Sequence, residues 1–266
     1  MMEMFSYPFM QKALIAGICI AIAAALVGVP LVLRKHSMIG DGVSHAAVGA
    51  FAIATVLGIA PLAFAIPAVI IASFLVLRLA NNKKSNGDAG IAILSASSLA
   101  IGTLAISISK GVNIDLNSYL FGSILAVNWL EVWLSLGVSI ISVVLFVLAY
   151  HRIFALTFEE EFAAAIGVKT KIYDAILAAI CSIIIVLGIR LVGALLISSL
   201  IIFPTLTAMC LAKSFKKIVI TSAIISVIAF VTGLIISYFA ATPTGATIVI
   251  VNLITLIMAK IYQKLV

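Results

Sequence analysis

The sequence predicts an all-α polytopic membrane protein, a bundle of eight or nine transmembrane helices. Of its 266 residues, 65% are hydrophobic and only 9% are charged, whereas a soluble domain averages about 45–50% apolar and about 25% charged residues. The apolar runs are too long and uniform for a β-barrel, whose strands alternate polar and apolar positions over about ten residues. Helices remain, because lipid offers no partner to the backbone and a helix satisfies its own hydrogen bonds.

Nine segments come close to the roughly 20 apolar residues that a membrane-spanning helix needs. The first is longer than the roughly 7–15-residue apolar core of a signal peptide, so we expect it to remain as a helix. No stretch between the spans is long enough for a soluble domain, so residues 1–266 should form a single transmembrane domain. If the pieces around Pro61 and Pro67 form one broken element, the count falls to eight. The predicted spans are 13–33, 44–60, 62–80, 89–109, 130–150, 172–189, 191–211, 218–239 and 244–260.

Most lysines and arginines fall on one side of this predicted bundle. With the N-terminus outside, thirteen of the 16 basic residues are cytosolic, and only Lys12, Lys110 and Arg190 face out. This distribution follows the positive-inside rule, and it explains the net charge of +7 better than nucleic-acid binding does. We therefore expect an external N-terminus and a cytosolic C-terminus. The thirteen are Arg34, Lys35, Arg78, Lys83, Lys84, Arg152, Lys169, Lys171, Lys213, Lys216, Lys217, Lys260 and Lys264.

Asp41 and His45 are the polar residues that most need an explanation, because they stand next to a long apolar segment. Their spacing puts both side chains on one helical face, which Gly49 continues. A carboxylate oxygen and an imidazole nitrogen together suit a divalent ion such as zinc or manganese. The alternative is an ordinary helix start, in which Asp41 caps the helix and His45 forms a local hydrogen bond.

The length of the second span favours a role in a pathway. A helix over 43–58 would be only about 24 Å long at 1.5 Å per residue, short of the roughly 30 Å hydrocarbon core. We therefore expect residues 40–42 to be irregular backbone inside the membrane, which is tolerated only against protein or a water-filled path. Broken helices of this kind build binding sites in transporters.

The connection over about 151–171 contains a candidate docking helix. Residues 158–168 combine three glutamates, an alanine run and a glycine, a composition typical of a short amphipathic helix with a stop. We expect this helix to lie on the cytosolic surface and to dock a soluble partner, with an ordinary solvated loop as the alternative. The candidate docking residues are Phe158, Glu159, Glu160, Glu161, Ile166 and Gly167.

Two further features suggest a pathway or a gate. Residues 114–127, which include Asp115, are too polar for a span and too apolar for a free loop, so we expect them to pack into the bundle near its outer opening. Pro204 lies inside an apolar run, where it removes one helical hydrogen bond and releases the carbonyl of Leu200. It is equally well explained as a packing kink and as a gate.

The sequence carries no motif of a hydrolase or a nucleotide-binding protein. It lacks the phosphate-binding pattern G-x-x-x-x-G-K-[ST], as well as H-E-x-x-H and G-x-S-x-G. The chain is therefore predicted not to be an enzyme. Its three cysteines, Cys19, Cys181 and Cys210, lie in apolar runs without C-x-x-C spacing, and we interpret them as packing residues.

These segments together resemble the membrane permease subunits of bacterial ABC importers for zinc, manganese and iron. The resemblance spans nearly the whole chain, and the zinc-uptake type is the most similar through the run Asp-Leu-Asn-Ser-Tyr-Leu-Phe-Gly. It implies that zinc, or next manganese, is transported and that no cofactor is permanently bound. The segments that carry the resemblance are 34–46, 115–127, 159–167, 192–204 and 242–246.

The resemblance also implies a set of partners. They are a second copy of the chain, two cytosolic ATPase subunits that bind ATP, and an extracytoplasmic metal-binding protein, all at the bacterial cytoplasmic membrane. In this assembly Asp41 and His45 would contact the metal, and 159–167 would be the coupling helix on the ATPase. The alternative is an ATP-independent secondary transporter or channel for a metal ion, which would not require that helix.

Overall fold

The computed structural model describes residues 6–80, 87–109, 119–120, 122 and 127–265, and its elements are helices. Nine helices in this part of the chain are long and apolar enough to cross a membrane, as the sequence predicted. The eight-helix alternative is wrong, because Pro67 lies inside one continuous helix that begins at Pro61. The nine are α2 (Pro8–Leu33), α3 (Ser37–Val56), α4 (Pro61–Ala80), α5 (Gly87–Ile108), α7 (Trp129–Leu148), α10 (Thr170–Val192), α11 (Ala194–Leu211), α12 (Phe215–Ala240) and α13 (Thr244–Leu265).

The expected break at residues 40–42 is wrong, because α3 begins at Ser37 and runs through both glycines. Gly42 provides close packing instead, whereas a side chain at Gly40 would make only an ordinary contact. A Cβ atom at Gly42 would lie 2.5 Å from the side chain of Ile91 on α5, and one at Gly40 would lie 3.5 Å from Ile201 on α11. The 20 residues of α3 span roughly 30 Å, which matches the hydrocarbon core. The second span is therefore long enough to cross the membrane without broken backbone.

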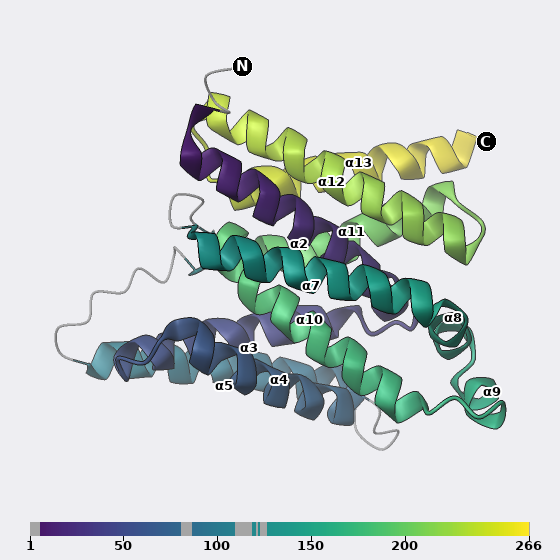
Figure 1. The fold of residues 1–266 in the computed structure, drawn as a ribbon, viewed down its shortest axis with the longest axis horizontal. Helices are drawn as coiled ribbons and strands as arrows, with labels where there is room; N and C mark the ends of the chain where they lie inside the picture. The colour runs from purple at the N-terminus through teal and green to yellow at the C-terminus, as the bar shows by residue number, and fades with distance from the viewer. Residues whose placement is uncertain (1–5, 81–86, 110–118, 121, 123–126, 266) are drawn as a thin grey trace.

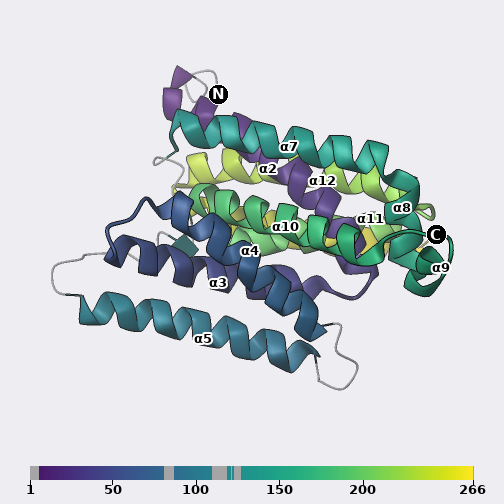
Figure 2. The same ribbon diagram turned by 60° about the horizontal axis from the view of Figure 1, so that its bottom comes forward.

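Three helices, α2, α3 and α10, form the centre of the bundle, with 72% of their most apolar window buried in each. On one side α2 packs against α7 and α12, whereas α3 packs against α4 and α5. Figure 2 shows α5 at the edge of the molecule beside α3 and α4. Only 11% of the apolar window of α5 is buried, and the exposed isoleucines and leucines of such outer helices suit contact with lipid.

Two short helices, α8 (Tyr150–Phe158) and α9 (Glu160–Ala165), lie between α7 and α10. Both lie at the end of the bundle that also holds the C-terminus, whereas α2 begins at the opposite end (Figure 1). The single helix predicted over 158–168 is therefore shorter than expected, since Phe158 belongs to α8 and α9 has six residues. Extended backbone at Glu159 separates the two, and Gly167, with φ +85°, follows the end of α9.

Candidate functional site

Asp41 and His45 lie together on α3, as their spacing predicted. His45 Nε2 is 3.7 Å from Asp41 Oδ2, and the side chains are 26% and 44% exposed, respectively. Two donors at this separation can both reach one ion at bond lengths of about 2.1 Å. The Nδ1 atom of His45 is buried without a hydrogen-bond partner among the described residues. The pair thus offers one oxygen and one nitrogen ligand on an accessible face.

By itself the pair does not complete a metal centre. In the described part of the chain, no group of three or more His, Cys, Asp or Glu side chains could hold a metal ion. An ion bound by Asp41 and His45 would need further ligands beyond the His, Cys, Asp and Glu side chains of the described residues. A partial coordination shell suits a site that binds an ion briefly and releases it. Both residues lie within roughly 12 Å of the start of α3, hence toward the α8–α9 end of the bundle.

Gly49 continues the face of Asp41 and His45 but is itself buried. A Cβ atom there would lie 2.4 Å from the carbonyl oxygen of Ser98 on α5, and one at Gly102 would lie 2.9 Å from the Cα of Gly49. Gly49 therefore brings α3 and α5 into direct backbone contact. Its assignment to the pathway remains a prediction.

Of the other two pathway candidates, Pro204 is buried inside α11, which continues through it to Leu211. Thr205, the next residue, contacts Ser222 on α12 through their hydroxyl groups, 3.3 Å apart. The role of Pro204 as a gate remains a prediction. Asp115 lies outside the described residues.

A buried ion pair joins α7 to α10 at the end where α2 begins. Arg190 Nε is 3.0 Å from Glu131 Oε1, and the Glu131 side chain is only 2% exposed. Its other oxygen accepts a hydrogen bond from the backbone N–H of Asn128, whose side chain caps α7 in return. The capping box satisfies Glu131 Oε2, and the charge of Arg190 stabilises Oε1, which is buried and accepts no hydrogen bond in the described part of the chain.

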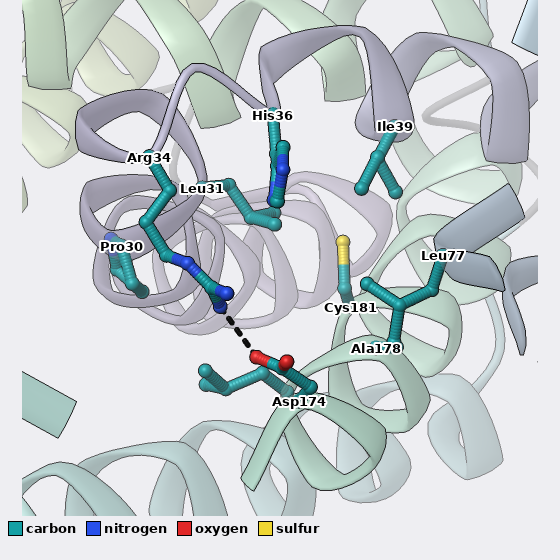
Figure 3. A pocket seen from close by; sticks show the side chains of 10 residues that line it. Pro30, Leu31, Arg34, His36, Ile39, Leu77, Asp174, Ala178 and Cys181 are labelled. Carbon is teal, nitrogen blue, oxygen red and sulfur yellow. Dashed lines mark hydrogen bonds and ion pairs between the residues drawn. The ribbon is translucent and has the colours of Figure 1, made fainter. Parts of the chain in front are cut away.

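A second cluster of charges lies at the opposite end. The guanidinium of Arg34 donates hydrogen bonds to Asp174 on α10 through Nη1 and to Glu160 on α9 through Nη2, the latter at 2.9 Å. Figure 3 shows Arg34 pointing toward Asp174, with His36 and Cys181 lining the same small cavity. Arg34 thereby connects the last turn of α2 to two other helices.

The candidate docking segment presents apolar side chains to solvent. Phe158, Phe162 and Ile166 are each 57% exposed on and around α9. The Phe158 ring is anchored at its base by Phe154 and Phe215, with ring centroids 5.0 and 6.0 Å away. The three glutamates 159–161 are also exposed. A short helix with exposed aromatic side chains next to three consecutive glutamates is suited to contact with another protein.

The sequence did not show that Asp174 and Glu160 pair with Arg34, or that Glu131 pairs with Arg190. A signal was present, since a carboxylate within an apolar span is costly and needs a partner. Asp174 follows the start of one predicted span closely enough to be taken for part of its polar flank. The partners themselves lie far apart in the chain, so only the packing of the helices identifies them.

Known proteins resemble this chain along nearly its whole length. The model of the ABC 3 transport family matches residues 6–263. The manganese import system permease protein ScaB of Streptococcus gordonii is 33% identical over 246 residues, or 92% of this chain and 88% of that protein. The high-affinity zinc uptake system membrane protein ZnuB of Haemophilus influenzae is 30% identical over 245 residues, or 92% of this chain and 94% of that protein.

A solved structure described as PsaBC from Streptococcus pneumoniae in complex with Fab has the same fold. It matches with a TM-score of 0.86 and 29% sequence identity, covering 97% of this chain and 93% of that one. Family, sequence relatives and fold therefore agree over the full bundle. The chain belongs to the ABC 3 transport family, as a relative of the permease subunits of metal importers.

Proposed function

We propose that this protein is the membrane subunit through which an ATP-driven importer moves a divalent transition metal, manganese or zinc, into the cell. The Asp41–His45 pair carries the proposal, because it places two metal-binding donors on a central helix of a membrane bundle. The chain has no phosphate-binding motif, so ATP would be hydrolysed by a separate subunit.

The donors of the pair bear on the choice of metal. A carboxylate oxygen suits manganese, an imidazole nitrogen suits zinc, and the absence of a thiolate beside them disfavours copper(I). The sequence motifs favoured zinc, whereas relatives named for manganese and for zinc are 33% and 30% identical. These identities differ too little to rank the metals, so the proposal covers both.

The remaining parts of the importer follow from the family and from the ends of the bundle. We propose a permease made of two copies of the chain in the cytoplasmic membrane, with the N-terminus outside and the α8–α9 end in the cytosol. An extracytoplasmic binding protein would deliver the metal to the outer end, and an ATPase would dock on α9. Support comes from the positive-inside distribution of basic residues and from the exposed apolar side chains around α9.

The test is transport by the assembled complex. The permease would be reconstituted in lipid vesicles with its ATPase and binding protein, and accumulation of radioactive manganese and zinc would be measured with and without ATP on the ATPase side. We expect accumulation against the metal gradient only with ATP, and competition between the two metals. Accumulation that is independent of ATP would instead assign the chain to secondary transporters or channels.

A further inference from the structure

Arg34 occupies a junction of three helices. It is the C-cap residue of α2, and its two terminal nitrogens bond carboxylates from two other helices, Asp174 of α10 and Glu160 of α9. A guanidinium is suited to this role, because its planar fork holds two carboxylates in fixed directions. The end of α2, the first turns of α10 and the start of α9 are therefore joined through one side chain.

The two arms of this junction differ in burial. The side chains of Arg34 and Asp174 are 10% and 5% exposed, whereas Glu160 is 49% exposed. The buried arm is shielded from water and salt, so it should hold Arg34 on α10. The exposed arm is weaker because water and salt screen it, but it is the contact through which a displacement of α9 reaches Arg34. The cluster thus joins the position of α9 to the ends of α2 and α10.

Arg34 is also close along the chain to the helix that carries the metal pair. Only Lys35 and His36 separate it from Ser37, the first residue of α3. This turn is tied back onto α2, since the N–H groups of Lys35 and His36 donate to the carbonyls of Val32 and Leu31 at 3.0 and 2.8 Å. With little slack in the turn, a displacement of the Arg34 side chain and backbone is passed on to the start of α3.

We infer that Arg34 is a positioning residue that couples α9 to α3: movement of α9 on the ATPase is transmitted through Glu160 and Arg34 to the helix that bears Asp41 and His45. This inference rests on the proposed function. Asp174 holds the buried end of the link, and Glu160 is the contact that registers the position of α9. No metal contact is required of any of the three residues.

The test uses Glu160→Gln, because substitution of Arg34 or Asp174 would leave a buried charge unpaired and could prevent folding. Glutamine keeps the size of the side chain and removes its charge. The measurement is the number of metal ions imported per ATP hydrolysed by the complete complex in vesicles. We expect this ratio to fall at least about fivefold, the lower range of typical coupling effects, while the melting temperature stays near wild type. Affinity for the ATPase should change by less than about fivefold, because an exposed ion pair contributes little to an interface.

The matched control is Lys171→Gln, which removes an exposed charge from the first turn of α10 and should leave the ratio unchanged. Glu160→Asp, which keeps the charge, should restore part of the ratio lost in Glu160→Gln. A wild-type ratio in Glu160→Gln would overturn the coupling role of Arg34 and leave the proposed function intact. Loss of ATPase binding in that variant would also overturn it, because Glu160 would then serve docking. If the wild-type complex showed no ATP-driven import, the proposed function itself would fail, and this inference with it.

Discussion

Single charged residues in this protein lie near the helix ends, and those that are buried are paired. Glu131 pairs with Arg190 at one end of the bundle, and Asp174 pairs with Arg34 at the other. An isolated charge in a low-dielectric interior is costly, so each of these side chains depends on its partner. Asp41 differs, because it is 44% exposed and lies 3.7 Å from His45 on the same helix. Its carboxylate is therefore accessible to a ligand.

We predict that Glu131→Gln lowers the free energy of unfolding by about 3 kcal/mol, the low end of the range for breaking a buried ion pair, because Arg190 stays 25% exposed. The measurement is thermal unfolding in detergent. Combining Glu131→Gln with Arg190→Gln should cost less than the sum of the two single changes. The control Glu161→Gln, on an exposed side chain, should change stability by less than about 0.5 kcal/mol. Additive effects of the two substitutions would contradict the pairing.

The helices α3 and α5 approach each other closely through a pair of glycines. Gly49 and Gly102 face each other there, and the carbonyl of Ser98 occupies the space that a side chain at 49 would need. This close approach fixes α3 and hence the direction in which Asp41 and His45 point.

We predict that Gly49→Ala and Gly137→Ala shift stability in opposite directions. The first would force α5 away from α3 and cost about 1–3 kcal/mol. The second adds a methyl group where the structure has open space on α7, and it should be neutral or stabilising by up to about 1 kcal/mol. Melting temperatures of the two variants in the same detergent provide the comparison. Equal shifts would show that the α3–α5 contact is less tight than the structure indicates.

The short helix α9 offers a second prediction, concerning the ATPase. Phe162→Asp should weaken ATPase binding by about 2 kcal/mol, roughly thirtyfold in affinity, because exposed aromatic side chains typically dominate such interfaces. Glu161→Gln should cost at most about 1 kcal/mol, since exposed ion pairs contribute little. Affinity measured on the purified subunits tests both. If the charge change were the more damaging of the two, docking would be electrostatic.

Sequence alone predicted the nine spans because each is a long apolar run with polar flanks, and only their ends differ from the structure by a few residues. It failed at α3, where two glycines suggested broken backbone but lie within a continuous helix, and Gly42 serves close packing against Ile91. It placed Asp41 and His45 on one face because helical spacing is a local property. It missed the partners of Arg34 because neighbouring helices are set by tertiary packing.

At the scale of the molecule, the nine candidate spans of the described residues place the start of α2 and the end of α13 at opposite ends of the bundle (Figure 1). In a background without Cys19, Cys181 and Cys210, we predict that Ser6→Cys is labelled by an impermeant thiol reagent from outside and that Gln263→Cys is not. The expectation follows from the excess of basic residues at the α8–α9 end. If only Gln263→Cys were labelled, the C-terminus and α9 would lie outside the cell, where no ATPase could reach α9.

The central claim is that metal passes Asp41 and His45, and ATP-driven uptake by variants of this pair tests it most directly. Asp41→Ala and His45→Ala, each assembled with ATPase and binding protein in vesicles, should reduce manganese and zinc uptake at least about tenfold, since even residues that only orient a metal ligand contribute about 10–100-fold. His151→Ala, an exposed histidine on α8, should transport normally. Wild-type uptake by both pair variants would contradict the claim and place the metal path elsewhere in the bundle.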